Sequence, residues 1–382
     1  MPSRYADFMR SNPRLRILVL SAWIVVCPVA SFGQMESNSL LLGWVPTEAP
    51  ADGRYQGSST CIQCHTEQAQ SMDTAMARAL QSASESRILS SNDRLSFTEG
   101  PYRYEIVRQG NRSVYTVTDG TETVSEPLLW SFGQGKVGQT YLFARDGAMR
   151  ETRVSFYLEP GGLDFTLGVP LDVPATLEEA VGRFVKPGEM RGCFGCHSTG
   201  AVRGPRLALD ELTPGVTCEG CHGAGVAHVQ AVRQNNLGNL AINNLKGMNA
   251  EEQSNFCGSC HRTWSQVILM GIKTVDNVRF QPYRLANSPC YDTEDARIGC
   301  TTCHNPHEDP IHEASYYDTK CLACHAPGVE GAAARVKTER ACPVGRQKCS
   351  GCHMPKVDVP GAHYRFTDHW IRIARPSDPY PN

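Results

Sequence analysis

The pattern Cys-x-x-Cys-His occurs seven times in this chain of 382 residues and uses 14 of its 17 cysteines. The motifs are Cys61-Cys64-His65, Cys193-Cys196-His197, Cys218-Cys221-His222, Cys257-Cys260-His261, Cys300-Cys303-His304, Cys321-Cys324-His325 and Cys349-Cys352-His353. Such high cysteine usage is typical of small disulfide scaffolds, but this chain is too long for that class. The cysteines therefore have to be explained by their spacing.

Each motif supplies the groups that attach a haem. Two thiols separated by two residues can each form a thioether with a haem vinyl group, and the adjacent histidine then binds the iron as its proximal ligand. Zinc ribbons need cysteine pairs without a histidine directly after each pair, and a thioredoxin-like redox site needs one motif in a βαβ unit. The sequence therefore predicts seven covalently bound c-type haems, with iron held by the seven motif histidines.

Five further histidines are candidates for the distal position on these irons. They are His228, His307, His312, His363 and His369. His228 follows the third motif and His307 the fifth, each too closely to reach the iron of its own motif from the far side, so we expect each to bind a neighbouring haem. Five histidines leave at least two of seven irons without a distal histidine, and an open iron would indicate an enzyme.

Two methionines are weaker candidates for the first iron. Residues 67–80 are expected to form a helix, on which Met72 and Met76 lie four residues apart on one face. A thioether can bind haem iron and raise its potential. Both side chains can equally pack against the porphyrin as apolar groups, so both interpretations stay open.

The N-terminus has the pattern of a signal peptide. Four arginines precede an apolar run over residues 17–29, and small residues follow it up to Gly33. The run is shorter than the about 20 residues of a transmembrane helix, with an uncleaved anchor as the alternative. Residues 1–33 are therefore expected to direct export to the periplasm or another oxidising compartment. The mature chain is expected to have no stable membrane span.

The charge of the mature chain favours a redox partner with a basic docking surface. Removing residues 1–33 takes away four arginines and one aspartate and changes the formal net charge from −2 to about −5. Seven ferric haems with their propionates would lower it to about −12. No basic tract is present, so nucleic acid is not an expected partner. The sequence leaves the oligomeric state open.

The motifs divide the mature chain into three parts. The first motif belongs to a haem-binding segment over residues 55–91, and the other six fall in a cytochrome domain over residues 180–375, where haems take the place of a conventional core. Between them, residues 92–170 alternate apolar and polar side chains and contain the turn Asp119-Gly120, which predicts a β-rich insertion. Residues 150–158 are expected to form one strand of a second hairpin. The expected fold class is mainly α and irregular, with a haem-packed core and this β-rich insertion.

Two further features are interpreted in structural terms. Gly133-x-Gly135-x-x-Gly138 has the form of a dinucleotide-binding pattern, but the residues after it predict a strand instead of the required helix, so a glycine-rich turn is expected. Cys290 and Cys342 are left over in the mature chain and favour a disulfide in an exported protein. Free thiols and an iron ligand are the alternatives.

Several stretches resemble a superfamily of multihaem cytochromes c that includes tetrahaem electron carriers, pentahaem nitrite reductases and octahaem hydroxylamine oxidoreductases. They are Cys218-Glu-Gly-Cys221-His222-Gly-Ala-Gly-Val-Ala-His228, Cys300-Thr-Thr-Cys303-His304-Asn-Pro-His307, Cys349-Ser-Gly-Cys352-His353-Met354-Pro355 and Phe366-Thr-Asp-His369-Trp370. The last is similar to the C-terminal signature of an uncharacterised branch, of which this chain would be a heptahaem member. The resemblance covers residues 55–85 and 180–375 and implies that His228 and His307 are distal ligands.

Two functions are compatible with these features. Closely spaced haems with saturated irons exchange electrons without binding substrate, which describes an electron carrier. The alternative is a reductase or oxidase of a small nitrogen or sulfur compound at one open haem, for which no catalytic residue can be assigned. Two departures from the superfamily weaken a transfer of nitrite reduction. Methionines stand where some relatives have a histidine after the first motif, and all seven motifs end in histidine where nitrite reductases often have one lysine. A filament subunit or redox sensor is a third interpretation.

Overall fold

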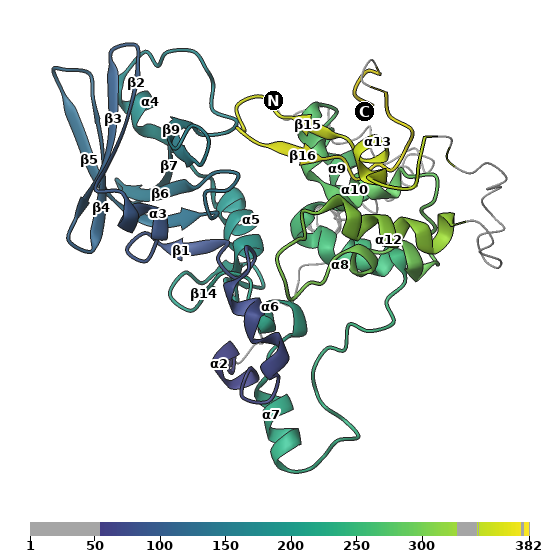
Figure 1. Cartoon of the computed structure of the whole chain (residues 1–382). Coiled ribbons are helices and arrows are strands. Elements are labelled where there is room, and N and C mark those ends of the chain that lie inside the picture. The colour runs from purple at the N-terminus through teal and green to yellow at the C-terminus, as the bar shows by residue number, and fades with distance from the viewer. Residues whose placement is uncertain (1–53, 327–341, 343, 376–377, 382) are drawn as a thin grey trace, which may run out of the picture. The chain divides into compact units, whose positions relative to one another are not determined.

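The largest element of regular structure is a curled antiparallel sheet (Figure 1). Its strands follow the order β10-β7-β6-β5-β4-β3-β2, and β1 pairs with the second half of β5. Their bounds are β1 (Leu80–Ser82), β2 (Arg94–Glu99), β3 (Tyr102–Gln109), β4 (Arg112–Thr118), β5 (Thr123–Phe132), β6 (Thr140–Arg145), β7 (Ala148–Thr152) and β10 (Gly182–Phe184). The computed structural model describes residues 54–326, 342, 344–375 and 378–381. The predicted signal peptide, residues 1–33, lies outside the described residues.

The sheet forms because its strands alternate buried and exposed side chains. In β3, Tyr102, Tyr104 and Ile106 are buried, while the residues between them face outward or are half-buried. The next strand continues this face with Tyr115 and Val117. Because successive strand residues point to opposite faces, this pattern produces one apolar face and one polar face. The buried aromatic and aliphatic residues form the main core of the β region.

A β-rich region is therefore present, as the sequence predicts, but the expected fold class is wrong. The described residues contain about 32% helix and 23% strand, so the fold is not mainly α. The long interval between the first two motifs contains enough alternating residues to build an eight-stranded sheet with its own core. Haem attachment alone therefore does not determine the architecture.

One predicted strand is divided in two. Residues 150–158 form β7 and then β8 (Val154–Tyr157), which leaves the main sheet and pairs with β9 (Gly162–Phe165). The division falls at Arg153, whose guanidinium is buried and donates hydrogen bonds to both carboxylate oxygens of Glu99 at 2.8 and 2.9 Å. A buried charge needs a partner, so this ion pair fixes where the chain leaves the sheet.

The helices are short, and most lie after the sheet. They are α2 (Ser58–Cys61), α3 (Arg87–Ser91), α4 (Leu177–Val181), α5 (Pro187–His197), α6 (Cys218–His222), α7 (Val226–Arg233), α8 (Ala250–His261), α9 (Trp264–Met270), α10 (Gln281–Ala286), α11 (Cys300–Cys303), α12 (Ala314–His325) and α13 (Cys349–His353). The 3-10 helices are η2 (Thr66–Asp73), η3 (Val275–Arg279) and η4 (Ala296–Ile298). Short two-stranded pairs complete the fold: β11 (Ser198–Thr199) with β14 (Thr213–Pro214), β12 (Val202–Arg203) with β13 (Arg206–Leu207), and β15 (Lys356–Asp358) with β16 (Arg365–Thr367).

The predicted helix over residues 67–80 is only partly present. A 3-10 helix ends at Asp73, Thr74 is extended, and Leu80 begins β1. Pairing of β1 with β5 therefore overrides the helical pattern. Met72 and Met76 consequently do not share one face of a continuous helix, and Met72 is exposed.

We predict that Arg153→Met destabilises the protein by about 3–5 kcal/mol, because it leaves the buried Glu99 carboxylate without its cation. Guanidinium unfolding followed by far-ultraviolet circular dichroism would measure the change. Arg94→Met is the matched control, since Arg94 forms an exposed ion pair with Glu105 in the same sheet and should cost at most about 1 kcal/mol. Equal effects of the two substitutions would contradict the role given to the buried pair.

Candidate functional site

Every motif coincides with a turn of helix or with the end of one. Three motifs complete the longer helices α5, α8 and α12, and the motifs of α6, α11 and α13 form helices of a single turn. The first motif begins at the last residue of α2. Residues three and four apart lie on the same side of a helix, so each turn presents two thiols and the start of an imidazole side chain on one face.

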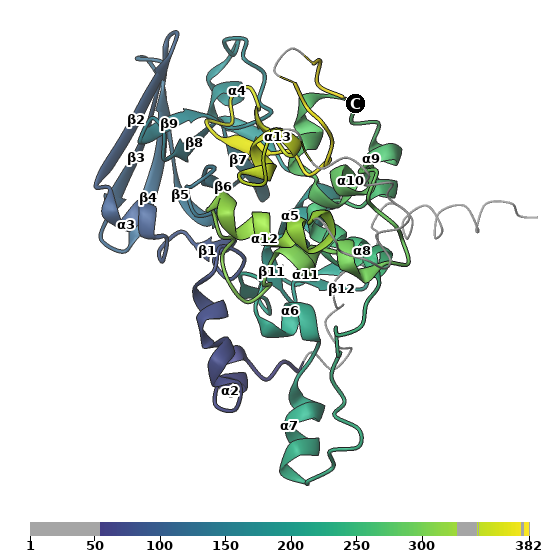
Figure 2. The same ribbon diagram turned by 45° about the vertical axis from the view of Figure 1, so that its right-hand side comes forward.

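The motif helices contact one another in two groups, and Cys221 of α6 interacts electrostatically with Cys257 and Cys260 of α8, which connects the groups. The contacts join α2 to α6, α5 to α8, α8 to α11, α11 to α12, and α12 to α13. Thiols of partner motifs influence one another's pKa in four of these pairs, which are Cys61 with Cys218, Cys196 with Cys260, Cys257 with Cys300, and Cys321 with Cys349. Figures 1 and 2 show α8, α12 and α13 in the same helical part of the chain, where α13 contacts α12. The fold therefore gathers motifs that are far apart in the sequence.

A buried carboxylate joins the first motif to the third. Glu219 lies inside the third motif and is 2% exposed. Its two oxygens accept hydrogen bonds from the main-chain N–H groups of Gln56 and Gly57, at 2.7 and 2.8 Å. It also accepts one from Gly225 at 2.7 Å, directly before α7. One side chain thus holds the segment before the first motif and the start of the helix that carries His228.

Two other motif pairs are joined in the same way. Gln253 in α8 accepts hydrogen bonds from the N–H and hydroxyl groups of Thr301, inside the fifth motif, at 3.1 and 2.9 Å. Asp318 in α12 accepts hydrogen bonds from the N–H groups of Lys348 and Cys349, at 2.7 and 2.8 Å. These acceptors satisfy N–H groups at the start of the partner helix that have no partner within it.

Three pairs of histidines face each other across the motif region. The ring centres are 6.3 Å apart for His65 and His228, 6.1 Å for His222 and His307, and 6.2 Å for His304 and His369. Each pair consists of one motif histidine and one predicted distal histidine. Two metal–nitrogen bonds of about 2 Å, added to the distances within the two rings, give a separation of about 6 Å. The observed separations therefore fit an iron between the rings.

Five histidines also have the tautomer that iron ligation requires. In each, Nδ1 lies beside a main-chain carbonyl oxygen, at distances of 2.9 to 3.2 Å. The contacts join His197 to Ala79, His222 to Asn243, His228 to Leu240, His353 to Arg372 and His369 to Thr367. A carbonyl can only accept, so Nδ1 carries the proton and Nε2 keeps its lone pair for a metal. These residues fit an iron-bound haem.

Burial keeps several of these rings neutral. The pKa of His369 is lowered to about 4, mainly by burial and also by the neighbouring His304, against a hydrogen bond with Thr367 that raises it. Burial likewise lowers the pKa of His197 and His261. A neutral imidazole is the form that binds a metal, so the electrostatics agree with the hydrogen bonding.

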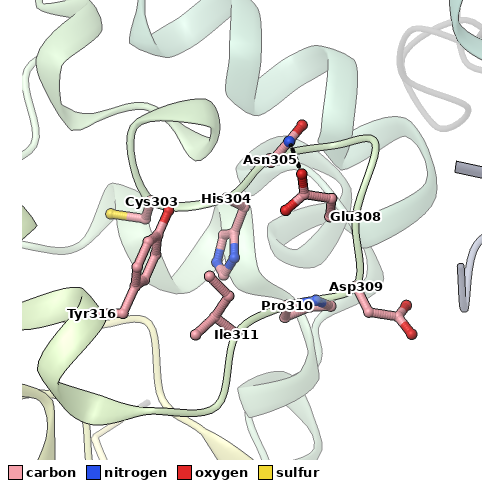
Figure 3. Close-up of a pocket in the computed structure, with 8 residues that line it drawn as sticks. All are labelled: Cys303, His304, Asn305, Glu308, Asp309, Pro310, Ile311 and Tyr316. Atoms are coloured by element: carbon pink, nitrogen blue, oxygen red, sulfur yellow. Dashed lines mark hydrogen bonds between the residues drawn. The ribbon is translucent and has the colours of Figure 1, made fainter. Parts of the chain in front are cut away.

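A small pocket lies beside His304 (Figure 3). Ile311 and Tyr316 lie next to its imidazole in this view, and a hydrogen bond of 2.7 Å from the Asn305 side-chain amide to Glu308 holds the loop that closes one side. The pocket therefore belongs to the surroundings of the fifth motif.

The loop that carries His307 is anchored to the residues that follow the first motif. Glu308 accepts a hydrogen bond from the Gln70 side chain at 3.0 Å, and Asp309 accepts one from the Ala75 N–H at 2.7 Å. These two contacts place His307 where it meets the third motif instead of the motif beside it in the sequence.

The other predicted distal histidines lie in different surroundings. His363 directs Nε2 toward the carboxylate of Asp164 at 2.8 Å, and its ring packs on Tyr157. Within the described ranges, neither His363 nor His312 forms a facing pair with a motif histidine. Four motif histidines, His197, His261, His325 and His353, are likewise without such a pair among the described residues.

The predicted disulfide between Cys290 and Cys342 is wrong, because both are free thiols. Cys290 is half-buried close to Cys321 and Cys324, and burial raises the pKa of its thiol. Cys342 is exposed. The two cysteines therefore occupy different environments.

Sequence reasoning missed the side chains that join the motifs. Glu219, Gln253 and Asp318 have no motif of their own, but each lies within four residues of the first cysteine of a Cys-x-x-Cys-His sequence. A polar residue within four residues of a motif's first cysteine was the available sequence signal for such a joining side chain. Among the described residues, no helix has the length and apolar character needed to cross a membrane.

We predict that Glu219→Ala loosens the first segment, because it leaves three N–H groups without their acceptor, at about 1–3 kcal/mol for each group that stays buried. Hydrogen exchange measured by mass spectrometry should accelerate over residues 54–61 and 225–228. Glu189→Ala is the control, since Glu189 is exposed and accepts a hydrogen bond from Lys186 at the start of its own helix. Unchanged exchange in both regions would contradict the joining role of Glu219.

Comparisons with known proteins agree with this site. Residues 175–223, which include the second and third motifs, match the family described as cytochrome c554 and c-prime. The chain is similar to the multiheme cytochrome MtrA of Shewanella baltica (strain OS185), with 25% identity over 201 residues that cover 49% of this chain and 52% of the relative. It therefore spans about half the length of this curated relative. No solved structure matches the chain. These similarities support a multihaem cytochrome c with covalently bound c-type haem.

Proposed function

We propose that the chain is an exported heptahaem c-type cytochrome that carries electrons to or from a redox partner. The observation that carries this proposal is the set of motif contacts, in which every motif has another motif beside it. A bound c-type haem supplies an iron that takes up and releases one electron. Haems attached at neighbouring motifs would lie close together, and an electron carrier requires such closely spaced haems.

The ligands follow from the facing histidines. The proposed proximal ligands are the seven motif histidines, attached beside the fourteen motif cysteines. The proposed distal ligands are His228 for the first haem, His307 for the third and His369 for the fifth, supported by ring separations of 6.1 to 6.3 Å. His312 and His363 stay candidates for the other irons. Met72 and Met76 are not needed at the first haem if His228 binds there.

The chain's own residues orient these ligands. Main-chain carbonyls hold the Nδ1–H of five histidines and direct Nε2 outward. Such contacts fix the ring orientation and increase the basicity of the ligand. Glu219, Gln253 and Asp318 hold the motifs against one another. Together these contacts support haem sites in which the protein fixes both the orientation of the histidine ligands and the positions of the motifs.

A second candidate function is reduction or oxidation of a small nitrogen or sulfur compound. It is favoured by the four motif histidines without a facing histidine in the described part of the chain. An iron with only a proximal ligand could bind a small molecule. Among the described residues, no group of polar side chains around one of these four histidines defines a substrate, so electron transfer is the preferred function.

The proposed location and partner rest on the sequence. A signal-peptide pattern over residues 1–33 supports export, and the mature net charge of about −5 supports a partner with a basic docking surface. Association with such a partner should weaken as salt is added, because salt screens charges at exposed interfaces.

We predict that the intact mature protein carries seven haems, measured by mass spectrometry together with a haem assay in pyridine. Replacing Cys349 and Cys352 together by alanine should remove one haem, because both thioether positions of the seventh motif are lost. Replacing Cys290 by alanine is the control and should leave the count unchanged. A wild-type count below seven would contradict the heptahaem assignment.

We also predict that a film of the protein on an electrode gives reversible signals over a range of potentials, with currents that stay the same when nitrite or hydroxylamine is added. An electron carrier exchanges electrons through its haems without converting a substrate, so the added compounds should not change the current. A monohaem cytochrome c, run on the same electrode, controls for the surface. A catalytic current that rises with the added compound would favour the second candidate function.

A further inference from the structure

Arg284 in α10 is a charged side chain with no exposure to solvent. Its guanidinium donates two hydrogen bonds to the carboxylate of Asp368, at 2.8 and 2.9 Å, and Asp368 is also fully buried. It lies over the rings of Trp370 and Tyr380, 4.9 and 4.6 Å from their centres. Two parallel hydrogen bonds fix both distance and orientation between such groups. Arg284 therefore holds the C-terminal segment against α10.

Asp368 is the centre of this contact. Besides Arg284, its oxygens accept hydrogen bonds from the Trp370 N–H at 3.0 Å and from the Arg372 guanidinium at 2.7 Å. Its own N–H donates to the carbonyl of Pro355 at 2.9 Å. The conformation of residues 368–372 is thus determined by one buried carboxylate.

Two histidines depend on this conformation. His369 directly follows Asp368, and its ring faces His304 at 6.2 Å. Arg372 is hydrogen-bonded to His353 twice through its main chain: its N–H donates to the His353 carbonyl at 3.1 Å, and its carbonyl lies 3.0 Å from Nδ1 of His353. The segment therefore contacts a histidine of the fifth motif on one side and the histidine of the seventh on the other.

We propose that Arg284 and Asp368 are positioning residues for the iron ligands of two haems. They hold His369 opposite His304, and through Arg372 they hold the carbonyl that orients His353. This inference rests on the ligands assigned under the proposed function. Loss of the pair releases His369 from the fifth haem and changes the potential of the seventh, while the haems of the first and third motifs keep their ligands.

The test uses the full haem-loaded protein and the variants Arg284→Met and Asp368→Asn. The second variant keeps the shape of the side chain, so it covers the case in which Arg284→Met does not fold. Carbon monoxide uptake by the fully reduced protein is titrated optically, and the ferric proteins are compared by electron paramagnetic resonance. We expect about one additional carbon monoxide per molecule relative to the wild type, because a haem that loses its distal histidine becomes open to an added ligand. A high-spin ferric signal should appear, and a redox titration should show a shifted potential for one further haem.

Two reference variants separate this effect from general destabilisation and from the ligand assignment. Arg153→Met breaks a second buried arginine–carboxylate pair, with Glu99 in the β region, and should leave carbon monoxide uptake unchanged. His369→Ala removes the proposed ligand itself and should add about one carbon monoxide. If His369→Ala gains uptake but neither folded variant of the pair does, the positioning role is overturned. If His369→Ala gains none, the ligand assignment fails and this inference fails with it.

Discussion

An imidazole binds a metal through one nitrogen, so its orientation depends on what the other nitrogen contacts. In this chain, Nδ1 of five histidines contacts a main-chain carbonyl oxygen outside the Cys-x-x-Cys-His motifs. Nδ1 of His197 meets the carbonyl of Ala79, 118 residues away in the sequence, and Nδ1 of His353 meets that of Arg372. The Cys-x-x-Cys-His turns supply the groups that attach haem, but the direction of five of the histidine rings is set by main-chain carbonyls outside the motifs.

The β region takes part in this arrangement. Ala79 directly precedes β1, whose pairing with β5 fixes the carbonyl that faces His197. Phe194 in α5 is fully buried and packs edge-on against Trp130 and Phe132 of β5. The sheet thus supports the helix that ends in the second motif. Strand alternation explains why the sheet has a polar and an apolar face. The contacts of Trp130 and Phe132 with Phe194 explain how the sheet supports α5.

The sequence was most informative where chemistry is local. Seven motifs predict haem attachment because thiols and imidazole are held within five residues, and the turn Asp119-Gly120 predicts the hairpin of β4 and β5. Pairings between distant residues were not predictable in this way. The partner of His65 is 163 residues away, and sequence spacing carries no information on such contacts. The helix expected around Met72 and Met76 is cut short because pairing of β1 with β5 supplies hydrogen bonds that local pattern cannot anticipate.

The central claim is that three pairs of facing histidines each share an iron. Near-infrared magnetic circular dichroism of the fully oxidised wild-type protein tests it most directly, because bis-histidine haems give a charge-transfer band distinct from those of other ligand sets. Intensity equivalent to at least three bis-histidine haems per molecule is the predicted result. Intensity equivalent to fewer than three would contradict the assignment of His228, His307 and His369 as distal ligands.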